Sequence, residues 1–163
     1  MRILPRLPFW IAATLAAALC SVTVHAQTAP LPTTGPEVTS TTVTTNLNDL
    51  LAGVHEIAAP GLPGSIAVFG PNAWPVVVGG AGKDARESVV AAALAGKGRV
   101  VAFGHTSYLD RDALQKADTG RLMLNAIRWV GGKAQPEVAL SGQPDLIGWL
   151  GTQGIHATAH GPQ

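Results

Sequence analysis

The chain has 163 residues and a formal net charge of +1, with 11 basic residues against 10 acidic ones. This balance excludes a basic stripe that could follow a phosphate backbone, so we expect no nucleic-acid binding. The single cysteine, Cys20, excludes an internal disulfide, so any core must be stabilised by packing.

The N-terminus has the pattern of a secretory signal peptide. Arg2 and Arg6 precede an apolar run over residues 7–19, which is too short to span a bilayer. The sequence Val-His-Ala that ends at Ala26 predicts cleavage after that alanine. Residues 1–26 would then be removed, and the mature chain would be secreted or periplasmic, without stable membrane insertion.

Two alternatives to this cleavage stay open. Lipidation at Cys20 would require a small residue before the cysteine, whereas Leu19 occupies that position. An uncleaved membrane anchor is disfavoured by the short apolar run and by the processing-like residues that follow it. After cleavage the mature chain would contain no thiol, so it would have neither a cysteine nucleophile nor a thiolate metal ligand.

Residues 27–45 are rich in threonine and proline and have few charged or large apolar side chains. Such a segment cannot bury enough surface to become ordered, which predicts a linker. An O-glycosylated stalk is the functional alternative. Residues 46–160 have the common size of one domain. We expect it to begin with a short helix whose N-cap is Asn48 or Asp49.

Two strands are expected next, over residues 65–69 and 74–79. The turn-forming residues 70–72 between them predict an antiparallel β-hairpin. Pro75 cannot donate a backbone hydrogen bond, so it must lie in an edge strand or at the start of a strand.

A helix is predicted over residues 84–95, with Asp84 as its N-cap and Gly96 just after its end. Its apolar face would consist of Val89, Val90, Ala93 and Leu94. Residues 99–103 then form a near-continuous apolar run. Such a run is typical of a central strand that helices cover on both faces.

The C-terminal half alternates helical and strand patterns. Asp118 or Thr119 predicts the start of an amphipathic helix that Gly131-Gly132 would end. A strand, a short helix and a last strand are then expected, over residues 136–140, 144–150 and 155–159. This order of elements predicts an α/β fold, a three-layer sandwich with a mostly parallel sheet and an N-terminal β-hairpin.

Several of these segments together resemble a known family. In chain order they are Phe69-Gly70, Trp74-Pro75-Val76, the alanine-rich residues 91–95, residues 96–101 and Gly104-His105. The combination is similar to the N-terminal domain of the TRP-channel-associated factors and their bacterial relatives. The resemblance covers roughly residues 50–150. It implies a flavodoxin-like fold, similar to class I glutamine amidotransferases, placed upstream of an enhancin-like zinc metallopeptidase module in many relatives.

The chain departs from both enzymatic patterns that this resemblance raises. An amidotransferase needs a cysteine nucleophile, which the mature chain would lack, so amidotransfer is excluded. A zinc metallopeptidase needs H-E-x-x-H on a helix, but His55-Glu56 is followed by Ile57-Ala58-Ala59. Proteolysis by this chain is therefore excluded as well. The resemblance implies an accessory domain, either on its own or in a shortened form of a peptidase.

The candidate ligand crevice consists of Gly70, Asn72, His105, Thr106, Ser107 and Tyr108. The last four follow the predicted central strand, and ligands of open α/β sheets bind beyond the carboxyl ends of strands. In a structural alternative, His105 only caps the strand through a backbone hydrogen bond and Tyr108 packs on the following loop. A nucleophilic Ser107 would need a placed base, and the G-x-S-x-G pattern is absent.

Other patterns favour structure over binding. Residues 79–83 fail the phosphate-loop pattern because Asp84 follows the lysine. His156 and His160 are four residues apart but lie near the terminus without a third ligand in sequence. No metal site and no cofactor are therefore predicted. A core position, rather than an exposed platform for carbohydrate, is expected for Trp74, Trp129 and Trp149.

The sequence thus predicts an exported, non-catalytic accessory domain that binds a glycan, a peptide or a partner protein. Two alternatives stay open: a small secreted hydrolase that uses His105 and Ser107, and a truncated fragment without activity. The hydrolase would hold these two side chains within hydrogen-bond reach in a closed pocket, with an acid nearby. The fragment would lack a last strand and expose a large apolar edge. No oligomeric state is indicated.

Overall fold

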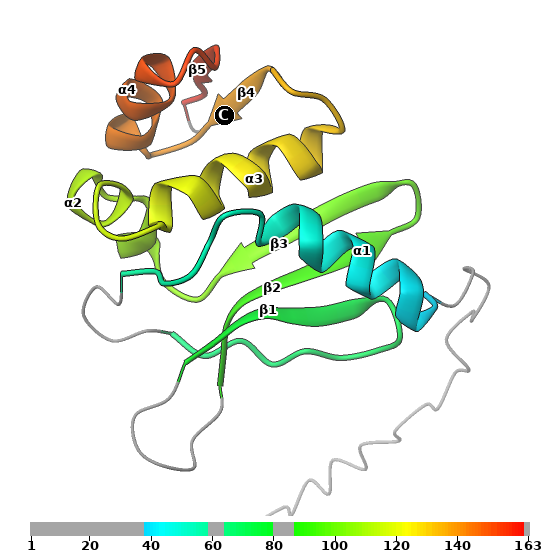
Figure 1. Ribbon diagram of the computed structural model, residues 1–163. Coiled ribbons are helices and arrows are strands. Elements are labelled where there is room, and N and C mark those ends of the chain that lie inside the picture. Colours follow the sequence, from blue (N-terminus) through cyan, green and yellow to red (C-terminus); the bar gives the residue numbers. More distant parts are fainter. Residues whose placement is uncertain (1–37, 59–63, 80–86, 162–163) are drawn as a thin grey trace, which may run out of the picture. The chain divides into compact units, whose positions relative to one another are not determined.

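A computed structural model describes residues 38–58, 64–79 and 87–161 (Figure 1). Residues 1–26, expected to be a signal peptide, lie outside the described residues, as does most of the glycine-rich segment that precedes Asp84. The described residues belong to one compact unit, Gly35–Gln163. They form a mixed α/β fold.

Three antiparallel strands form the main sheet, in the order β1 (Ala73–Gly79), β2 (Glu87–Ala95) and β3 (Gly98–Phe103). The central strand β2 pairs on both sides, with Ala91 opposite Pro75 of β1 and Ala102 of β3. Gly96 has a φ of 60°, which suits the first position of the two-residue turn between β2 and β3. Because β1 lies at a sheet edge, the placement predicted from Pro75 is confirmed.

The prediction of a helix over residues 84–95 is wrong. Its described part is strand β2, in which Val89, Val90, Ala91 and Ala92 are all buried. Alanine favours helices in isolation, and this preference made the segment resemble one. In the fold, hydrogen bonding to a strand on each side and burial of the side chains outweigh that intrinsic preference.

The predicted hairpin between residues 65–69 and 74–79 is also wrong. Residues 65–69 form only an isolated bridge, in which the Ile66 N–H donates to the Ser88 carbonyl at 2.7 Å. Strand β1 pairs with β2 instead. The run over residues 99–103 does form a strand, but β3 lies at an edge of the main sheet and not at its centre.

Helix α1 (Ser40–Leu50) begins inside the segment that was expected to be a linker. Thr39 is its N-cap, and the Thr39 hydroxyl accepts a hydrogen bond from the Thr42 N–H at 3.3 Å. The helix starts well before the cap predicted at residues 48–49. Apolar side chains at helical spacing pack it against the core, namely Val43, Leu47 and Leu50.

Helix α3 (Thr119–Gly131) packs into two hydrophobic clusters (Figure 1). Leu122, Ala126 and Trp129 lie in the cluster that α1 and the main sheet share. Met123 lies in the second cluster, with residues of the C-terminal segment. The helix ends before Gly132, whose φ of 66° confirms the predicted glycine end.

The C-terminal segment consists of β4 (Val138–Leu140), α4 (Pro144–Thr152) and β5 (Ala157–Ala159), which confirms the predicted strand, helix and strand. Strands β4 and β5 pair in parallel, and α4 connects them. Leu146 and Leu150 of α4 are buried together with Ile155. Pro144 lies in the first turn of α4, where its missing N–H costs no hydrogen bond.

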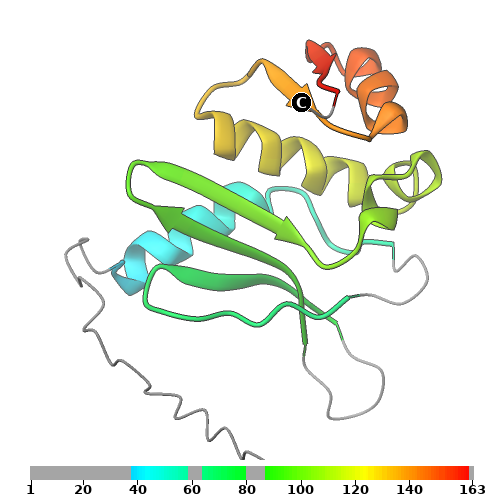
Figure 2. The ribbon, with the colours of Figure 1, turned by 180° about the vertical axis from the view of Figure 1, so that it is seen from behind.

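The expectation of a mostly parallel sheet with an N-terminal hairpin is therefore wrong. The main sheet is antiparallel, and parallel pairing among the described residues is confined to β4 and β5. Figure 2 shows the main sheet from behind. Exposed apolar side chains in and beside this sheet include Phe69 and Val100, at 82% and 48% exposure. None of the described helices has the length and apolarity needed to cross a lipid bilayer.

Candidate functional site

The chain turns at Gly104 directly after β3. The Gly104 N–H donates to the Val89 carbonyl at 2.9 Å, and the backbone of Gly104 lies against that of Gly64. A Cβ atom on either glycine would overlap the carbonyl group of the other. Both positions therefore require glycine for this close approach, which holds the segment that follows β3 in place.

His105 caps the short helix η1 (Thr106–Leu109). Its Nδ1 accepts a hydrogen bond from the Ser107 backbone N–H at 3.1 Å. Tyr108 is 1% exposed, and its ring packs near that of Phe103, with the ring centroids 6.0 Å apart. Burial raises the pKa of the Tyr108 hydroxyl above its usual value. These contacts agree with the alternative to a ligand crevice, in which His105 makes a capping hydrogen bond to the backbone and the ring of Tyr108 is packed inside the protein.

The same geometry disfavours the hydrolase. Nδ1 of His105 is already occupied by a backbone donor, and the side chain of His105 is exposed instead of enclosed in a pocket. Because Nδ1 accepts this hydrogen bond, the neutral imidazole carries its proton on Nε2, and neither nitrogen is free to take a proton from a nucleophile. In the described parts of the chain, no group of three or more His, Cys, Asp or Glu side chains could hold a metal ion.

The predicted crevice residues fall into two groups at opposite ends of β2. The Asn72 carbonyl accepts from the Leu94 N–H at 2.9 Å, close to the turn between β2 and β3. Gly70 lies two residues before it in the chain. By contrast, Gly104 pairs with Val89 near the start of β2, and His105 follows it. The structure therefore does not bring Gly70 and Asn72 together with residues 105–108.

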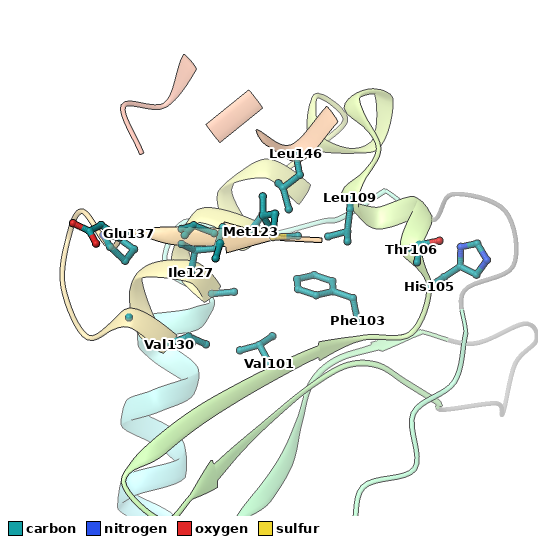
Figure 3. A pocket seen from close by; sticks show the side chains of 16 residues that line it. Val101, Phe103, His105, Thr106, Leu109, Met123, Ile127, Val130, Glu137 and Leu146 are labelled. Atoms are coloured by element: carbon teal, nitrogen blue, oxygen red, sulfur yellow. The ribbon is translucent and has the colours of Figure 1, made fainter. Parts of the chain in front are cut away.

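An apolar groove of about 480 Å³ lies between β3, α3 and β4, and we call it the β3–β4 groove. Its apolar lining includes Val101, Phe103, Met123, Ile127, Val130, Val138 and Leu140. In Figure 3, Val101 and Phe103 extend from β3 toward Met123 and Ile127 of α3. Such a lining removes apolar ligand surface from water and so favours binding.

Polar side chains lie at the margins of this groove. His105 and Thr106 line one end, and Glu137 lies at the other (Figure 3). The imidazole of His105 points away from the hollow between β3 and α3 (Figure 3). Of the predicted crevice residues, only His105 and Thr106 therefore contribute to the groove, and they do so at its rim.

Two of the groove walls are strands with an unpaired edge. Within residues 64–79 and 87–161, β3 pairs only with β2, and β4 pairs only with β5. An unpaired edge presents backbone N–H and C=O groups that can bind another extended segment. The groove thus combines apolar side chains with strand edges, which suits an extended peptide.

The apolar lining of α3 was not identified as a candidate site from the sequence. Met123, Ile127 and Val130 follow the helical spacing that predicted this amphipathic helix. The same spacing is expected for residues in a core. Only the elements that pack opposite each side chain decide whether it lies in the core or in a groove.

Fold and groove together define a small α/β domain with a groove suited to binding. The chain belongs to the family described as "TRPM8, N-terminal domain", which matches residues 17–161. This match confirms the resemblance to the N-terminal domain of the TRP-channel-associated factors.

Two curated relatives contain a region similar to this chain. The chain is 36% identical over 87 residues to the TRPM8 channel-associated factor homolog of Danio rerio, a match that covers 52% of this chain and 9% of that protein. It is 31% identical over 97 residues to TRPM8 channel-associated factor 3 of Mus musculus, covering 59% of this chain and 10% of that protein. The chain therefore spans about a tenth of the length of these relatives.

One solved structure is similar in fold, that of IMPa from Pseudomonas aeruginosa in complex with an O-glycopeptide. The TM-score is 0.58 at 20% sequence identity, and the match covers 73% of this chain and 14% of that chain. At this identity the similarity establishes a shared fold, while function has to be argued from the site.

Proposed function

We propose that this chain is an exported, non-catalytic accessory domain that binds an extended segment of a protein partner in the β3–β4 groove. The observation that carries the proposal is an apolar groove of about 480 Å³ walled by two strands, each with one edge that no described strand pairs with. A bound segment would add backbone hydrogen bonds to a strand edge and place alternate side chains among the apolar groups.

The comparisons support a protein as the partner. The names of the two curated relatives refer to association with a channel protein. IMPa was solved in complex with an O-glycopeptide, a ligand that contains both a peptide and a glycan. Both ligand classes were expected from the sequence. The apolar lining of the groove favours the peptide, because a glycan needs many polar partners for its hydroxyl groups.

Two finer expectations belong to this proposal. They are export after cleavage behind Ala26 and a position upstream of an enhancin-like peptidase module. Export is tested by expressing the full chain in its native host and determining the N-terminus of the secreted or periplasmic product by mass spectrometry. We expect that product to begin at Gln27. A product that retains residues 1–26 would contradict export by cleavage.

The groove is tested with peptides selected on the purified chain from a random peptide-display library. We expect the selected peptides to shift backbone amide NMR signals in β3, α3 and β4. Val130→Glu should abolish their binding, because it places a charge in the apolar lining. Val78→Glu is the matched control, since Val78 and Val130 have similar exposures of 51% and 45% and Val78 does not line the groove.

Two results would contradict the groove as the binding site. In the first, the selected peptides shift signals outside the groove only. In the second, Val130→Glu and Val78→Glu bind the peptides equally well. Thermal unfolding of both variants, followed by circular dichroism, checks that any loss of binding does not come from loss of the fold.

A further inference from the structure

Among the tryptophans of the described residues, Trp149 is the one that the core does not fully enclose, although it packs against the second hydrophobic cluster. Trp74 and Trp129 are 4% and 5% exposed, and their rings meet edge to face with the centroids 6.2 Å apart. These two residues therefore occupy the core, as the sequence predicted. Trp149 of α4 is only partly buried. It lines two hollows, of about 450 Å³ and 130 Å³.

The ring of Trp149 lies against the first turn of α3. A Cβ atom on Gly120 would lie 2.7 Å from Cζ2 of this ring, which is closer than real Cβ contacts. The absence of a side chain at Gly120 therefore allows the indole to pack on α3. Gln115 lines the same two hollows as Trp149, so both side chains can contact one ligand that extends across them.

The larger hollow, which we call the Trp149 cleft, has a polar lining unlike that of the β3–β4 groove. Its side chains include Gln115, Gln153, Asn125, Arg121 and Arg128. The two arginines are seven residues apart on α3, hence on one face and about 10 Å apart along the helix axis. Both are exposed. Arg128 makes one hydrogen bond within the described residues, from Nε to the Ala134 carbonyl at 3.1 Å.

The carboxylate that lines this cleft, that of Asp118, already accepts hydrogen bonds from the backbone. Asp118 Oδ2 accepts hydrogen bonds from the backbone N–H groups of His55 and Glu56, at 2.9 and 3.4 Å. These bonds go to one oxygen of the carboxylate, and the nearby charge of Arg121 also lowers the pKa of this carboxyl. Because Arg121 and Arg128 are both exposed, an acidic ligand can reach them.

We propose that the Trp149 cleft binds an acidic oligosaccharide, in which every second sugar carries a carboxylate. The indole of Trp149 offers an apolar face for the C–H face of a sugar ring. The amide groups of Gln115 and Gln153 can donate to and accept from hydroxyl groups. The guanidinium groups of Arg121 and Arg128 match carboxylates on alternate sugars, since each can donate two parallel hydrogen bonds to one carboxylate.

A sugar fits this lining better than an acidic peptide does. Two arginines alone would serve either ligand. The partly exposed Trp149 ring and the amide side chains that line the same cleft add stacking and hydroxyl recognition, which a chain of acidic side chains does not use. The Trp149 cleft and the β3–β4 groove share no lining residue, so each of the two proposals can be tested without the other.

The test is an NMR titration of the purified chain with a hyaluronan tetrasaccharide, in which glucuronate alternates with N-acetylglucosamine. We expect the indole N–H signal of Trp149, assigned with Trp149→Phe, to shift during the titration. Arg121→Gln combined with Arg128→Gln should weaken binding at least about tenfold, because each charged hydrogen bond contributes on that order. Lys97→Gln removes one exposed charge outside the cleft and should leave the affinity unchanged.

Neutral chitotetraose and a tetraglutamate peptide distinguish the features that the cleft recognises. The proposal is supported if the hyaluronan tetrasaccharide shifts the Trp149 signal and if chitotetraose and tetraglutamate both bind more weakly than this tetrasaccharide. Equal binding of tetraglutamate would overturn it, because the cleft would then recognise acidic charge alone. Equal binding of chitotetraose would overturn the role of the arginines. No shift of the Trp149 signal with any sugar at millimolar concentration would overturn the site itself, without involving any variant.

Discussion

The indole Nε1 of Trp129 donates a buried hydrogen bond to Oδ1 of Asn46 at 3.0 Å and thereby links α3 to α1. The backbone carbonyl of Trp129 accepts from Arg99 of β3 at 2.7 Å, and the Arg99 guanidinium lies over the indole, 5.1 Å from its centroid. One residue thus connects two helices and the main sheet. Trp129 therefore helps to hold α1 to the rest of the domain, together with the hydrogen bond from Asn125 of α3 to the Leu50 carbonyl.

Replacing Asn46 should destabilise the domain. In Asn46→Ala the buried indole N–H loses its acceptor, and we expect unfolding to become easier by about 1–3 kcal/mol. Urea denaturation followed by circular dichroism measures this change. Asn48→Ala, at an exposed position of the same helix, controls for the higher helix propensity of alanine. Equal stability of the two variants would show that the bond contributes nothing.

Gly104 should not tolerate alanine. The new Cβ would overlap the Gly64 carbonyl, so the two backbone segments would have to separate. We expect a loss of about 1–3 kcal/mol or more, as in overpacked cores. Gly148→Ala is the control, because a Cβ there would meet no described atom within 4 Å apart from its chain neighbours and the backbone of its own helix, and alanine suits the interior of α4. Thermal unfolding should therefore show a lower midpoint for Gly104→Ala and an unchanged or higher one for Gly148→Ala.

His105 can be tested as a capping residue. His105→Ala removes the acceptor for the Ser107 N–H, and we expect a loss of about 0.5–2 kcal/mol in the unfolding free energy. His105→Asn should retain part of that stability, since an asparagine oxygen can accept the same bond. If His105 were instead a catalytic base, ester hydrolysis by the chain would fall to the uncatalysed rate in both variants, whatever their stability.

Asp118 should make stability depend on pH in the acid range. The hydrogen bond from the His55 N–H, together with that from Glu56, holds the pKa of this carboxyl below its usual value. Its stabilising contribution is present above the ordinary carboxyl pKa and is lost as the pH falls through the lowered folded value. We expect Asp118→Asn to be less stable than the unchanged chain at pH 7. The difference should shrink toward pH 2 in chemical denaturation, and a constant difference would contradict this role.

The predicted crevice shows which features local sequence patterns predict and which they do not. The pair Gly104-His105 predicted a turn after a strand, and in the structure the chain turns at Gly104 directly after β3. Nothing along the chain indicated that Asn72 would lie at the other end of β2. That separation follows from the pairing of β1 with β2. Strands pair through backbone N–H and C=O groups, which nearly every residue has, so the side-chain sequence does not reveal which segments pair.

Local chemistry determined the elements whose signals lie within a few residues. The amphipathic spacing and closing glycine of α3, the proline that starts α4 and the β-branched run of β3 were all readable in the sequence alone. Pro75 likewise limited its own position to an edge strand or to the start of a strand, because a proline nitrogen has no hydrogen to donate, and the structure shows the edge strand.

Tertiary structure decided the conformation of the alanine-rich residues 87–95 and the start of α1. Alanine has a preference for helix that amounts to only a fraction of a kcal/mol per residue over many other residues. Hydrogen bonds to two neighbouring strands and burial of four consecutive side chains outweigh it, so the segment is a central strand. In the same way, the threonine-rich residues at the start of α1 are helical because Val43 and Leu47 pack against the core and stabilise the helix. Such contacts join residues far apart in the chain, and no local pattern contains them.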